Sequence, residues 1–361
     1  MERKTILFFH QGRSSFVEED LRILSNSFRV REFYFSTQRS GPKIITAFQY
    51  LLQFIRQFLW LLINIRSGDF LFAWFSDFHS FLPAVFSSFF NKPLLVVNGG
   101  YDAVNNKELG YGIFRDTWQK RFGIYVLRHA RLLLPVDQTL IRAEPAAEYW
   151  GEAYPNGILH HIPDLDTEWT ELPTGYNPSA WPAGPAERKA EVLTVAFIDT
   201  IRTAKIKGID LYIECARSLP EFTFRIIGVP EEMQGTLGKA YHLPQNIFMY
   251  PPVKRDELSE FYRQASVYAQ LSRSEGLPNV LCEAMLSGCI PVGSPVYGIP
   301  KAISNTGFIA EKPDTALIAS LIKKAHQQQS VDSRKKVRDR IIDEYSLKKR
   351  ENTLTSILNN L

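Results

Sequence analysis

The chain has 361 residues, of which 45% are hydrophobic and 22% charged, and its formal net charge is +4 at pH 7. This length and composition are those of a globular protein large enough for two domains with separate cores. The small net charge gives no basic footprint for nucleic acid, so we expect no nucleic-acid partner. The cysteines, Cys215, Cys282 and Cys289, follow neither metal-ligand spacing nor an even disulfide count, which predicts reduced core residues.

Strand-like and helix-like segments alternate from the start of the chain. The strand-like segments are Thr5 to His10, Phe28 to Phe35, Asp69 to Trp74, Pro93 to Asn98 and Arg131 to Val136. This alternation predicts an α/β domain with a doubly wound, largely parallel sheet. Met1 to Lys4 lead directly into the first strand and leave no room for the apolar region of a signal peptide, so we expect a cytoplasmic protein.

A second alternating series follows a proline-rich passage, residues 172–185. Its strand-like segments are Val192 to Ile198, Phe222 to Gly228, Asn246 to Tyr250, Val267 to Gln270, Ile290 to Gly293 and Phe308 to Ala310. We interpret the proline-rich passage as an interdomain linker. The sequence therefore predicts two Rossmann-like domains, an N-terminal one over residues 1–185 and a C-terminal one over residues 186–346.

Residues 44–65 are rich in Leu, Ile, Phe and Trp over about the length that crosses a bilayer. The polar residues of this segment fall on one side of a helical wheel: Gln49, Gln53, Arg56, Gln57 and Asn64. A spanning helix would place them in hydrocarbon, which we reject. Two interpretations remain, a buried domain helix with one wet edge, or an amphipathic helix in the interface of an anionic membrane, favoured by Lys43 and Arg66 at its ends.

A basic stretch lies near the C-terminus. Residues 323–350 hold ten Lys or Arg against four Asp or Glu. A solvated helical face is the first interpretation of this stretch, and a contact with anionic lipids is the second.

The most informative segment is residues 273–288, Arg-Ser-Glu-Gly-Leu-Pro-Asn-Val-Leu-Cys-Glu-Ala-Met-Leu-Ser-Gly. Pro278 suits the first turn of a helix, so Glu275 should precede the helix and Glu283 should lie inside it. The free N–H groups and positive dipole end of a helix start suit a phosphate, and a carboxylate beside them accepts from hydroxyls. Phosphate together with polyol hydroxyls describes a nucleotide sugar. Alone, two carboxylates at this spacing are more typical of one helix cap and one surface residue.

Continued through residues 289–293 and 298–300, this segment closely resembles the Glu-x7-Glu signature of retaining glycosyltransferases with the GT-B fold, group 1 or family 4. The resemblance implies two Rossmann-like domains facing across a cleft, with the last helix, here residues 347–361, crossing back to the first domain. It assigns Glu275 to the donor sugar and Glu283 to the ribose. It also implies donor contacts for the residues between them: Gly276, Leu277, Asn279 and Val280.

A second segment suits the phosphates. Residues 199–208 read Asp-Thr-Ile-Arg-Thr-Ala-Lys-Ile-Lys-Gly and resemble the Gly-Arg-x4-Lys-Gly segment of the family's donor domain, with Ile201 in place of its first glycine. Arg202 and Lys207 would then neutralise the charge that builds as the nucleoside diphosphate leaves. The alternative is a surface cluster of cations that meets no ligand.

Shorter segments fit the same template. Gly228 resembles the glycine turn after the second donor-domain strand, and Val253 lies where the family's main chain reads the nucleobase. Gly12 follows the first strand, and it either approaches the phosphates or makes a plain strand-to-helix turn.

Residues 98–102, Asn-Gly-Gly-Tyr-Asp, stand where relatives have a segment that faces the donor sugar, so Gly99, Gly100 and Asp102 are candidate donor-binding residues. Asn98 replaces a histidine that is familiar there. The missing imidazole is then absent, or it is supplied by His79 or His129.

The resemblance implies transfer with retention of the anomeric configuration, in which the departing phosphate helps to take the acceptor's proton. It implies no cofactor and no metal. The only Asp-x-Asp, Asp164-Leu165-Asp166, lies in a loop-like run, and a metal–nucleotide site there is the weaker alternative.

The sequence thus predicts a cytoplasmic, membrane-peripheral glycosyltransferase that uses a nucleotide-diphosphate sugar. The expected acceptor is a glycan or a lipid-linked molecule of cell-surface polysaccharide or lipopolysaccharide synthesis. A nucleotide-sugar epimerase of the same fold is an alternative, although it would need acid/base residues that the motif does not offer. A non-catalytic, nucleotide-binding partner subunit is another, and the joint presence of Glu275, Glu283, Arg202 and Lys207 argues against it.

Overall fold

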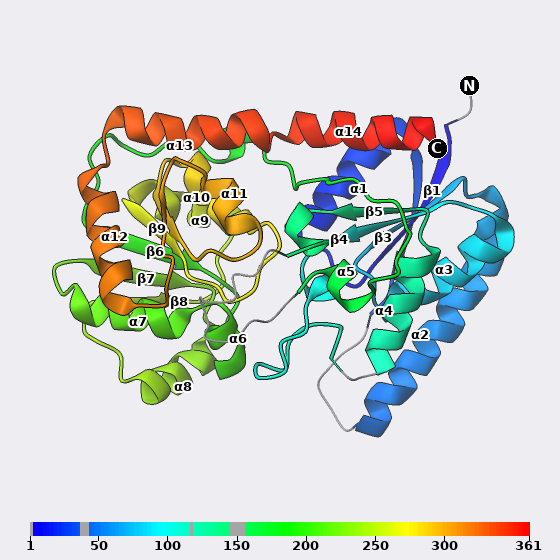
Figure 1. The fold of residues 1–361 in the computed structure, drawn as a ribbon, viewed down its shortest axis with the longest axis horizontal. Helices are drawn as coiled ribbons and strands as arrows, with labels where there is room; N and C mark the ends of the chain where they lie inside the picture. The colour runs from blue at the N-terminus through cyan, green and yellow to red at the C-terminus, as the bar shows by residue number, and fades with distance from the viewer. Residues whose placement is uncertain (1–2, 37–42, 116–117, 144–155) are drawn as a thin grey trace. The chain divides into compact units, whose positions relative to one another are not determined.

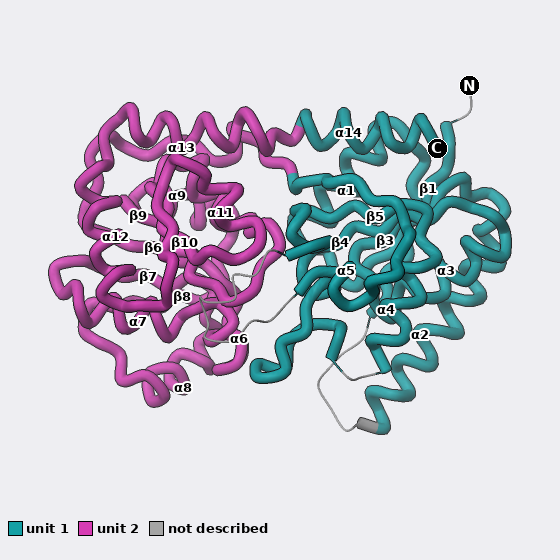
Figure 2. The backbone as a smooth tube through the Cα atoms, in the orientation of Figure 1, with its two compact units in different colours: residues 1–143, 156–174, 348–361 teal, residues 144–155, 175–347 magenta. Residues whose placement is uncertain are grey.

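The computed structural model of the protein describes residues 3–36, 43–115, 118–143 and 156–361. The chain divides into two compact units, each built around a parallel sheet covered by helices (Figures 1 and 2). Among the described residues, unit 1 comprises 3–36, 43–115, 118–143, 156–174 and 348–361, and unit 2 comprises 175–347.

Unit 1 has a five-stranded sheet in the order β2-β1-β3-β4-β5. Its strands are β1 (Thr5–His10), β2 (Arg29–Tyr34), β3 (Phe70–Trp74), β4 (Leu94–Asn98) and β5 (Leu132–Pro135). Its helices are α1 (Ser15–Ser27), α2 (Lys43–Asn64), α3 (Phe78–Phe90), α4 (Trp118–His129), α5 (Ile158–His161) and α14 (Leu347–Asn360), with short 3-10 turns η1 (Ile65–Ser67), η2 (Tyr101–Ala103) and η3 (Gln138–Leu140). Every residue of β1, β3, β4 and β5 is buried, as expected for parallel strands covered on both faces.

Unit 2 has a six-stranded parallel sheet in the order β11-β10-β9-β6-β7-β8. Its strands are β6 (Glu191–Val195), β7 (Thr223–Ile227), β8 (Ile247–Tyr250), β9 (Val267–Gln270), β10 (Ile290–Gly293) and β11 (Phe308–Ile309). Its helices are η4 (Pro178–Ala180), α6 (Ile201–Ile206), α7 (Ile209–Ser218), α8 (Glu231–Tyr241), α9 (Arg255–Gln264), α10 (Asn279–Leu286), α11 (Gly298–Ile303), α12 (Thr315–Gln327) and α13 (Val331–Glu344).

The predicted strands of both series are confirmed, and so is the doubly wound parallel α/β class. The order of unit 2 reverses between β6 and β9, and open α/β sheets bind ligands beyond the carboxyl ends of the strands at such a switch point. The cysteines Cys215, Cys282 and Cys289 are buried and free, as predicted.

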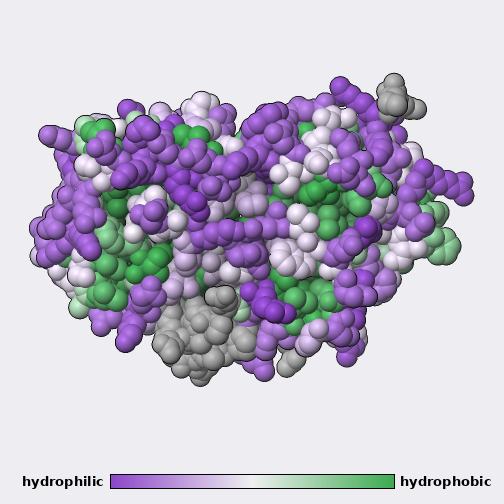
Figure 3. Space-filling model, turned by 45° about the horizontal axis from the view of Figure 1, so that its top comes forward, coloured by the Kyte–Doolittle hydropathy of each residue, from purple (hydrophilic) through white to green (hydrophobic). Residues whose placement is uncertain are grey.

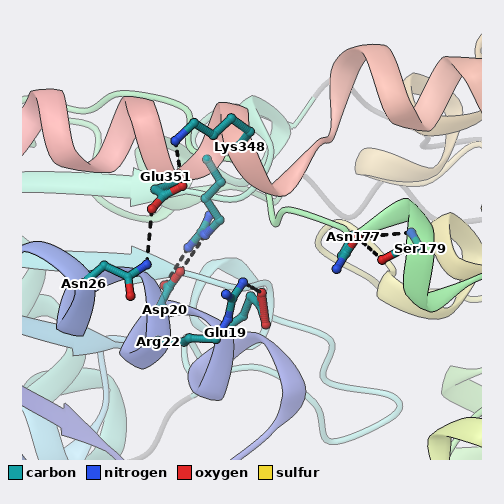
Figure 4. A network of polar contacts seen from close by, with 9 residues as sticks. Glu19, Asp20, Arg22, Asn26, Asn177, Ser179, Lys348 and Glu351 are labelled. Atoms are coloured by element: carbon teal, nitrogen blue, oxygen red, sulfur yellow. Dashed lines mark hydrogen bonds and ion pairs between the residues drawn. The ribbon is translucent and has the colours of Figure 1, made fainter.

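A buried ion pair fastens α14 to α1 within unit 1. The Arg350 guanidinium donates to both oxygens of Asp20, at 2.6 and 2.7 Å, and neither side chain is more than 2% exposed. Trp74 Nε1 also donates to Asp20. At the rim of this contact, Glu351 accepts from Lys348 and from Asn26 (Figure 4). Because the two buried charges are paired and hydrogen-bonded to each other, their interaction offsets the cost of removing them from water.

The second half of the proline-rich passage is packed into unit 2 rather than free. Trp181 is 1% exposed, and Arg338 donates to the carbonyls of Pro178 and Trp181. Arg334 donates to the Pro185 carbonyl. The predicted boundary at 185 therefore lies inside unit 2. Three arginines of the basic stretch, Arg334, Arg338 and Arg350, point inward, so the stretch is neither a fully solvated face nor a continuous lipid contact.

The orientation of α2 is the reverse of the predicted buried helix with one wet edge. Gln57 is fully buried and donates to the His79 carbonyl at 2.7 Å, and Asn64 Oδ1 accepts from Arg31 at 2.7 Å. The polar edge faces the protein because buried backbone and side-chain groups there supply its hydrogen-bond partners. Most of the large apolar side chains of α2 face outward, whereas Leu61 is buried and Phe54 and Trp60 contact aromatic rings of unit 1. None of the helices in the described ranges is long and apolar enough to cross a membrane.

Candidate active site

A glycine turn between α6 and α7 brings Lys207 to the loop that follows β9. Gly208 has a φ of +69°, and a Cβ there would lie 1.9 Å from the Leu271 carbonyl oxygen. Only glycine permits this approach. The contact is fastened by Arg273, whose backbone N–H donates to the Ile206 carbonyl at 2.8 Å and whose guanidinium pairs with Asp210 at 2.6 and 2.7 Å.

Lys207 and Glu275 form an ion pair at this point. Lys207 Nζ lies 2.6 Å from Glu275 Oε1, and their side chains are 28% and 12% exposed. The same oxygen accepts from Gln270 Nε2 at 3.1 Å and from Ser272 Oγ at 2.9 Å. Within the described part of the chain, the hydrogen bonds and ion pairs of this carboxylate all involve Oε1. Oε2 is therefore the oxygen available to a ligand hydroxyl.

The hydrogen bonds to Glu275 continue into the core of unit 2. Gln270 donates to Ser272 at 2.8 Å, and Tyr268 OH donates to Gln270 Oε1 at 3.1 Å. Burial raises the pKa of Tyr268 well above its usual value, which keeps it a donor. These three residues belong to none of the sequence motifs. The available signal was the polar end of the otherwise buried strand β9, because a buried polar side chain needs a partner.

Glu283 lies inside α10 and Glu275 precedes it, as the helix signals predicted. Glu283 is buried, and Tyr262 OH donates to its Oε2 at 3.3 Å. Burial raises the pKa of Glu283 to about 7, although Arg255 and the Tyr262 hydrogen bond act in the opposite direction. The rings of Tyr262 and Tyr268 are 6.0 Å apart, so a buried aromatic pair lies between the partners of the two glutamates.

The residues between the two glutamates take different positions. The first N–H groups of α10, those of Asn279 and Val280, have no intrahelical acceptor. The Asn279 side chain accepts from Tyr176 OH at 2.7 Å. Gly276 is buried and its carbonyl accepts from Gly298 N–H. The Leu277 side chain is buried, so Leu277 would meet a ligand through its backbone.

Three further candidates of unit 2 lie on neighbouring loops. Arg202 is exposed on the first turn of α6, and Val253 is half-buried in the loop after β8. Gly228 has a φ of +104°, and a Cβ there would lie 2.3 Å from the Ala196 carbonyl oxygen. It therefore lets the chain leaving β7 approach the chain leaving β6.

In unit 1, Asp102 holds the loop that follows β4. It is fully buried and accepts from the Asn98 side chain at 2.7 Å and from the backbone N–H groups of Gly99 and Gly100 at 3.1 and 3.2 Å. Burial raises its pKa, and these hydrogen bonds oppose the rise. Asp102 therefore acts on the shape of the Gly99-Gly100 loop. Gly12 lies in the loop after β1, and its carbonyl accepts from His10 Nδ1 at 3.0 Å.

A polar chain that sequence analysis missed joins the loops of unit 1. Asp77, in the loop between β3 and α3, accepts from Gln119 at 2.8 Å and from Gln11 at 3.4 Å, and Tyr101 OH donates to Gln119 at 3.1 Å. Gln11, Asp77 and Tyr101 follow the carboxyl ends of β1, β3 and β4, which was the available signal.

The hydrogen bonds of both candidate histidines go to backbone carbonyls instead of this polar chain. His79 is fully buried and donates from Nε2 to the Trp74 carbonyl, and burial lowers its pKa to about 4. His129 ends α4 and stacks on Tyr125, shortly before β5 begins. Each ring therefore has partners within unit 1.

The Asp-x-Asp segment already has a partner within the protein. Both oxygens of Asp164 accept from Arg128 Nη2 at 2.7 Å, and this bond lowers the pKa of Asp164. Over the described ranges, no group of three or more His, Cys, Asp or Glu is placed to hold a metal ion.

Comparisons with known proteins agree with this geometry. Residues 186–344 match the family described as "Glycosyl transferases group 1". This part of the chain is thus similar to a group 1 glycosyl transferase domain. The whole chain has the GT-B fold: sucrose-phosphate synthase from Thermosynechococcus elongatus superimposes with a TM-score of 0.76 and 14% identity over 99% of both chains. HepE from Anabaena, solved in complex with UDP-glucose, gives a TM-score of 0.68 at 12% identity over 99% of this chain and 100% of its own.

A curated relative matches in sequence. The D-inositol 3-phosphate glycosyltransferase of Mycobacteroides abscessus is 29% identical over 167 residues, which are 42% of this chain and 34% of the relative. The match thus spans about a third of that relative's length.

Within the part of the chain that matches the family, the Lys207–Glu275 pair and the start of α10 lie in the loops beyond the carboxyl ends of β6 and β9.

Proposed function

We propose that the protein is a retaining glycosyltransferase that moves a sugar from a nucleoside-diphosphate sugar to a hydroxyl of a glycan or lipid-linked acceptor, in cell-surface polysaccharide or lipopolysaccharide synthesis. The observation that carries this proposal is the Lys207–Glu275 pair at the switch point of a group 1 domain. This pair places a cation that can bind phosphate beside a carboxylate that can accept hydrogen bonds from sugar hydroxyls.

Each polar group at this edge has a role in binding the donor. Lys207 and Arg202 meet the diphosphate, together with the backbone N–H groups at the start of α10. Glu275 accepts from the sugar hydroxyls through Oε2, while its Oε1 stays with Gln270 and Ser272. Glu283 accepts from the ribose. The structure of HepE with UDP-glucose supports this class of donor.

Transfer then breaks the bond between the anomeric carbon and the diphosphate oxygen. The acceptor oxygen attacks from the face on which the diphosphate leaves, and the diphosphate takes the acceptor's proton, so the configuration is retained. Positive groups fixed beside the leaving oxygen lower the barrier because they need no reorganisation as charge develops.

We expect transfer to continue nearly unchanged in excess EDTA. Lys207, Arg202 and the α10 N-terminus supply the positive charge that a metal ion supplies in other enzymes, and Asp164 is already paired with Arg128. Initial rates with and without chelator measure this. Loss of turnover that manganese restores would contradict the metal-independent mechanism.

A donor screen tests the function itself. The purified protein is mixed with individual nucleotide sugars, and bound donors are found by a rise in the thermal midpoint, because a ligand of the native state stabilises it by mass action. Mass spectrometry with candidate acceptors then shows the product. A transferred sugar supports the proposal, whereas an isomerised donor would indicate an epimerase, and binding without turnover of any donor would indicate a non-catalytic subunit.

A further inference from the structure

The exposed face of α2 is apolar throughout its length. Ten large hydrophobic side chains of α2 are between 44% and 83% exposed: Ile44, Ile45, Phe48, Leu51, Leu52, Ile55, Phe58, Leu59, Leu62 and Ile63. Among the described residues of this helix that are exposed, only Arg56 is polar. A surface helix of a water-soluble domain normally shows the opposite arrangement, with its polar face outward. An apolar face of this size, interrupted only by Arg56 among its described residues, indicates an interaction surface.

Two further exposed aromatic side chains lie on the helices that neighbour α2. α3 packs against both α2 and α4. Phe58 of α2 contacts Phe86 of α3, and Phe81 of α3 contacts Phe122 of α4. Phe89 of α3 is 82% exposed, and Trp118 at the start of α4 is 71% exposed. The face drawn in Figure 3 shows hydrophobic patches that are interrupted by hydrophilic residues.

The charges of these three helices have one sign. The sequences of α2, α3 and α4 contain five Lys or Arg and no Asp or Glu. Arg56 and Arg121 are exposed, as is Arg66 just beyond α2, and Arg121 lies over the Trp118 ring at 4.6 Å. Arg128 is paired with Asp164. The side chain of Lys43, predicted to mark one end of the helix, lies outside the described residues.

We propose that α2, Phe89 and Trp118 form a docking surface for the interface of an anionic lipid bilayer, with α2 lying along the membrane plane. Apolar side chains enter the acyl boundary, and the surrounding arginines meet lipid phosphates. A second copy of the chain fits this surface less well. In a two-fold interface the same patch meets itself, so the basic residues would face one another.

The docking does not depend on the chemistry proposed for unit 2. If that chemistry also holds, a docked enzyme would take an acceptor that is anchored in the same bilayer. The inner leaflet of a cell membrane carries the negative surface potential that this set of charges requires.

Vesicle sedimentation tests the surface without using activity. The full chain is sedimented with vesicles of phosphatidylcholine alone and of phosphatidylcholine mixed with phosphatidylglycerol. We expect the bound fraction to be about tenfold higher on the mixed vesicles at low salt, and to fall as salt screens the arginines. Absence of binding to the mixed vesicles, or equal binding to both kinds, would overturn the proposal.

Two sets of variants separate the apolar and the electrostatic parts. The triple variant Leu52→Gln, Ile55→Gln and Leu59→Gln should bind mixed vesicles at least about tenfold more weakly. The double variant Arg66→Glu and Arg121→Glu should lose most of the preference for anionic lipid.

The matched control is Phe248→Gln with Val331→Gln, which changes exposed apolar residues of unit 2 and should bind like the wild type. If the triple variant does not fold, Ile63→Gln with Phe89→Ser replaces it, because these side chains are 78% and 82% exposed. A concentration-dependent dimer that the α2 variants abolish, without vesicle binding by the wild type, would assign the face to a second copy and contradict the membrane proposal.

Discussion

Lys207→Ala is expected to lower the turnover of sugar transfer by about 10²- to 10³-fold, or about 3 to 4 kcal/mol in the barrier. Lys207 Nζ is 2.6 Å from Glu275 and half-buried beside the start of α10, so its charge acts with little screening on a leaving diphosphate. Removing it also leaves Oε1 of Glu275 with only two neutral donors, Gln270 and Ser272. Arg202→Ala should lower turnover in the same direction.

The matched control is Lys205→Ala, which removes an exposed lysine from α6, two residues before Lys207. It should transfer sugar at the wild-type rate. Glu275→Gln should also lower turnover, while calorimetry with the free nucleoside diphosphate should give nearly unchanged affinity because Glu275 faces the sugar. Near-normal transfer by a folded Lys207→Ala protein would mean that the diphosphate binds elsewhere.

Much of the fold follows from the sequence because parallel strands buried on both faces are continuous apolar segments. β9, β10 and β1 were predicted residue for residue for this reason. The start of α10 was also predictable, because Pro278 and the helical spacing after it are local signals. The site residues that make motifs, Glu275 and Lys207, were predictable as candidates.

Other features depend on contacts that are distant in sequence. Gln270 and Ser272 were missed because their role comes only from facing Glu275. The face of α2 that lies against the domain was also not predictable from the periodicity of the helix. A helical wheel separates polar from apolar faces, but buried partners such as the His79 carbonyl, which accepts from Gln57, decide which face lies inward. The packing of residues 175–185 depends likewise on Arg334 and Arg338, far along the chain.

Glu283→Gln is expected to change both nucleotide binding and the pH dependence of stability. Ionised Glu283 is the better acceptor for ribose hydroxyls, so the affinity of the wild type for the free nucleoside diphosphate should rise as pH increases through about 7. The Gln variant should bind donor and free nucleotide about 1.5 to 3 kcal/mol more weakly at high pH and show no such rise. Tyr262→Phe, which removes the donor to the carboxylate, should move the rise to higher pH. Calorimetry across pH measures all three proteins.

The stability effect has a defined sign. The pKa of Glu283 is raised from 4.5 to about 7 in the folded state, so the native state binds this proton more tightly than the unfolded chain. The stability that comes from protonated Glu283 is fully present below pH 4.5 and is lost as pH rises to about 7. The free energy of unfolding should therefore fall by about 3 kcal/mol over this range. The Gln variant cannot ionise and should lack this part of the fall, so its stability relative to the wild type should improve between pH 4.5 and pH 8. Urea unfolding at both pH values measures the difference, and an equal difference at the two would mean that Glu283 is already ionised in the folded protein at low pH.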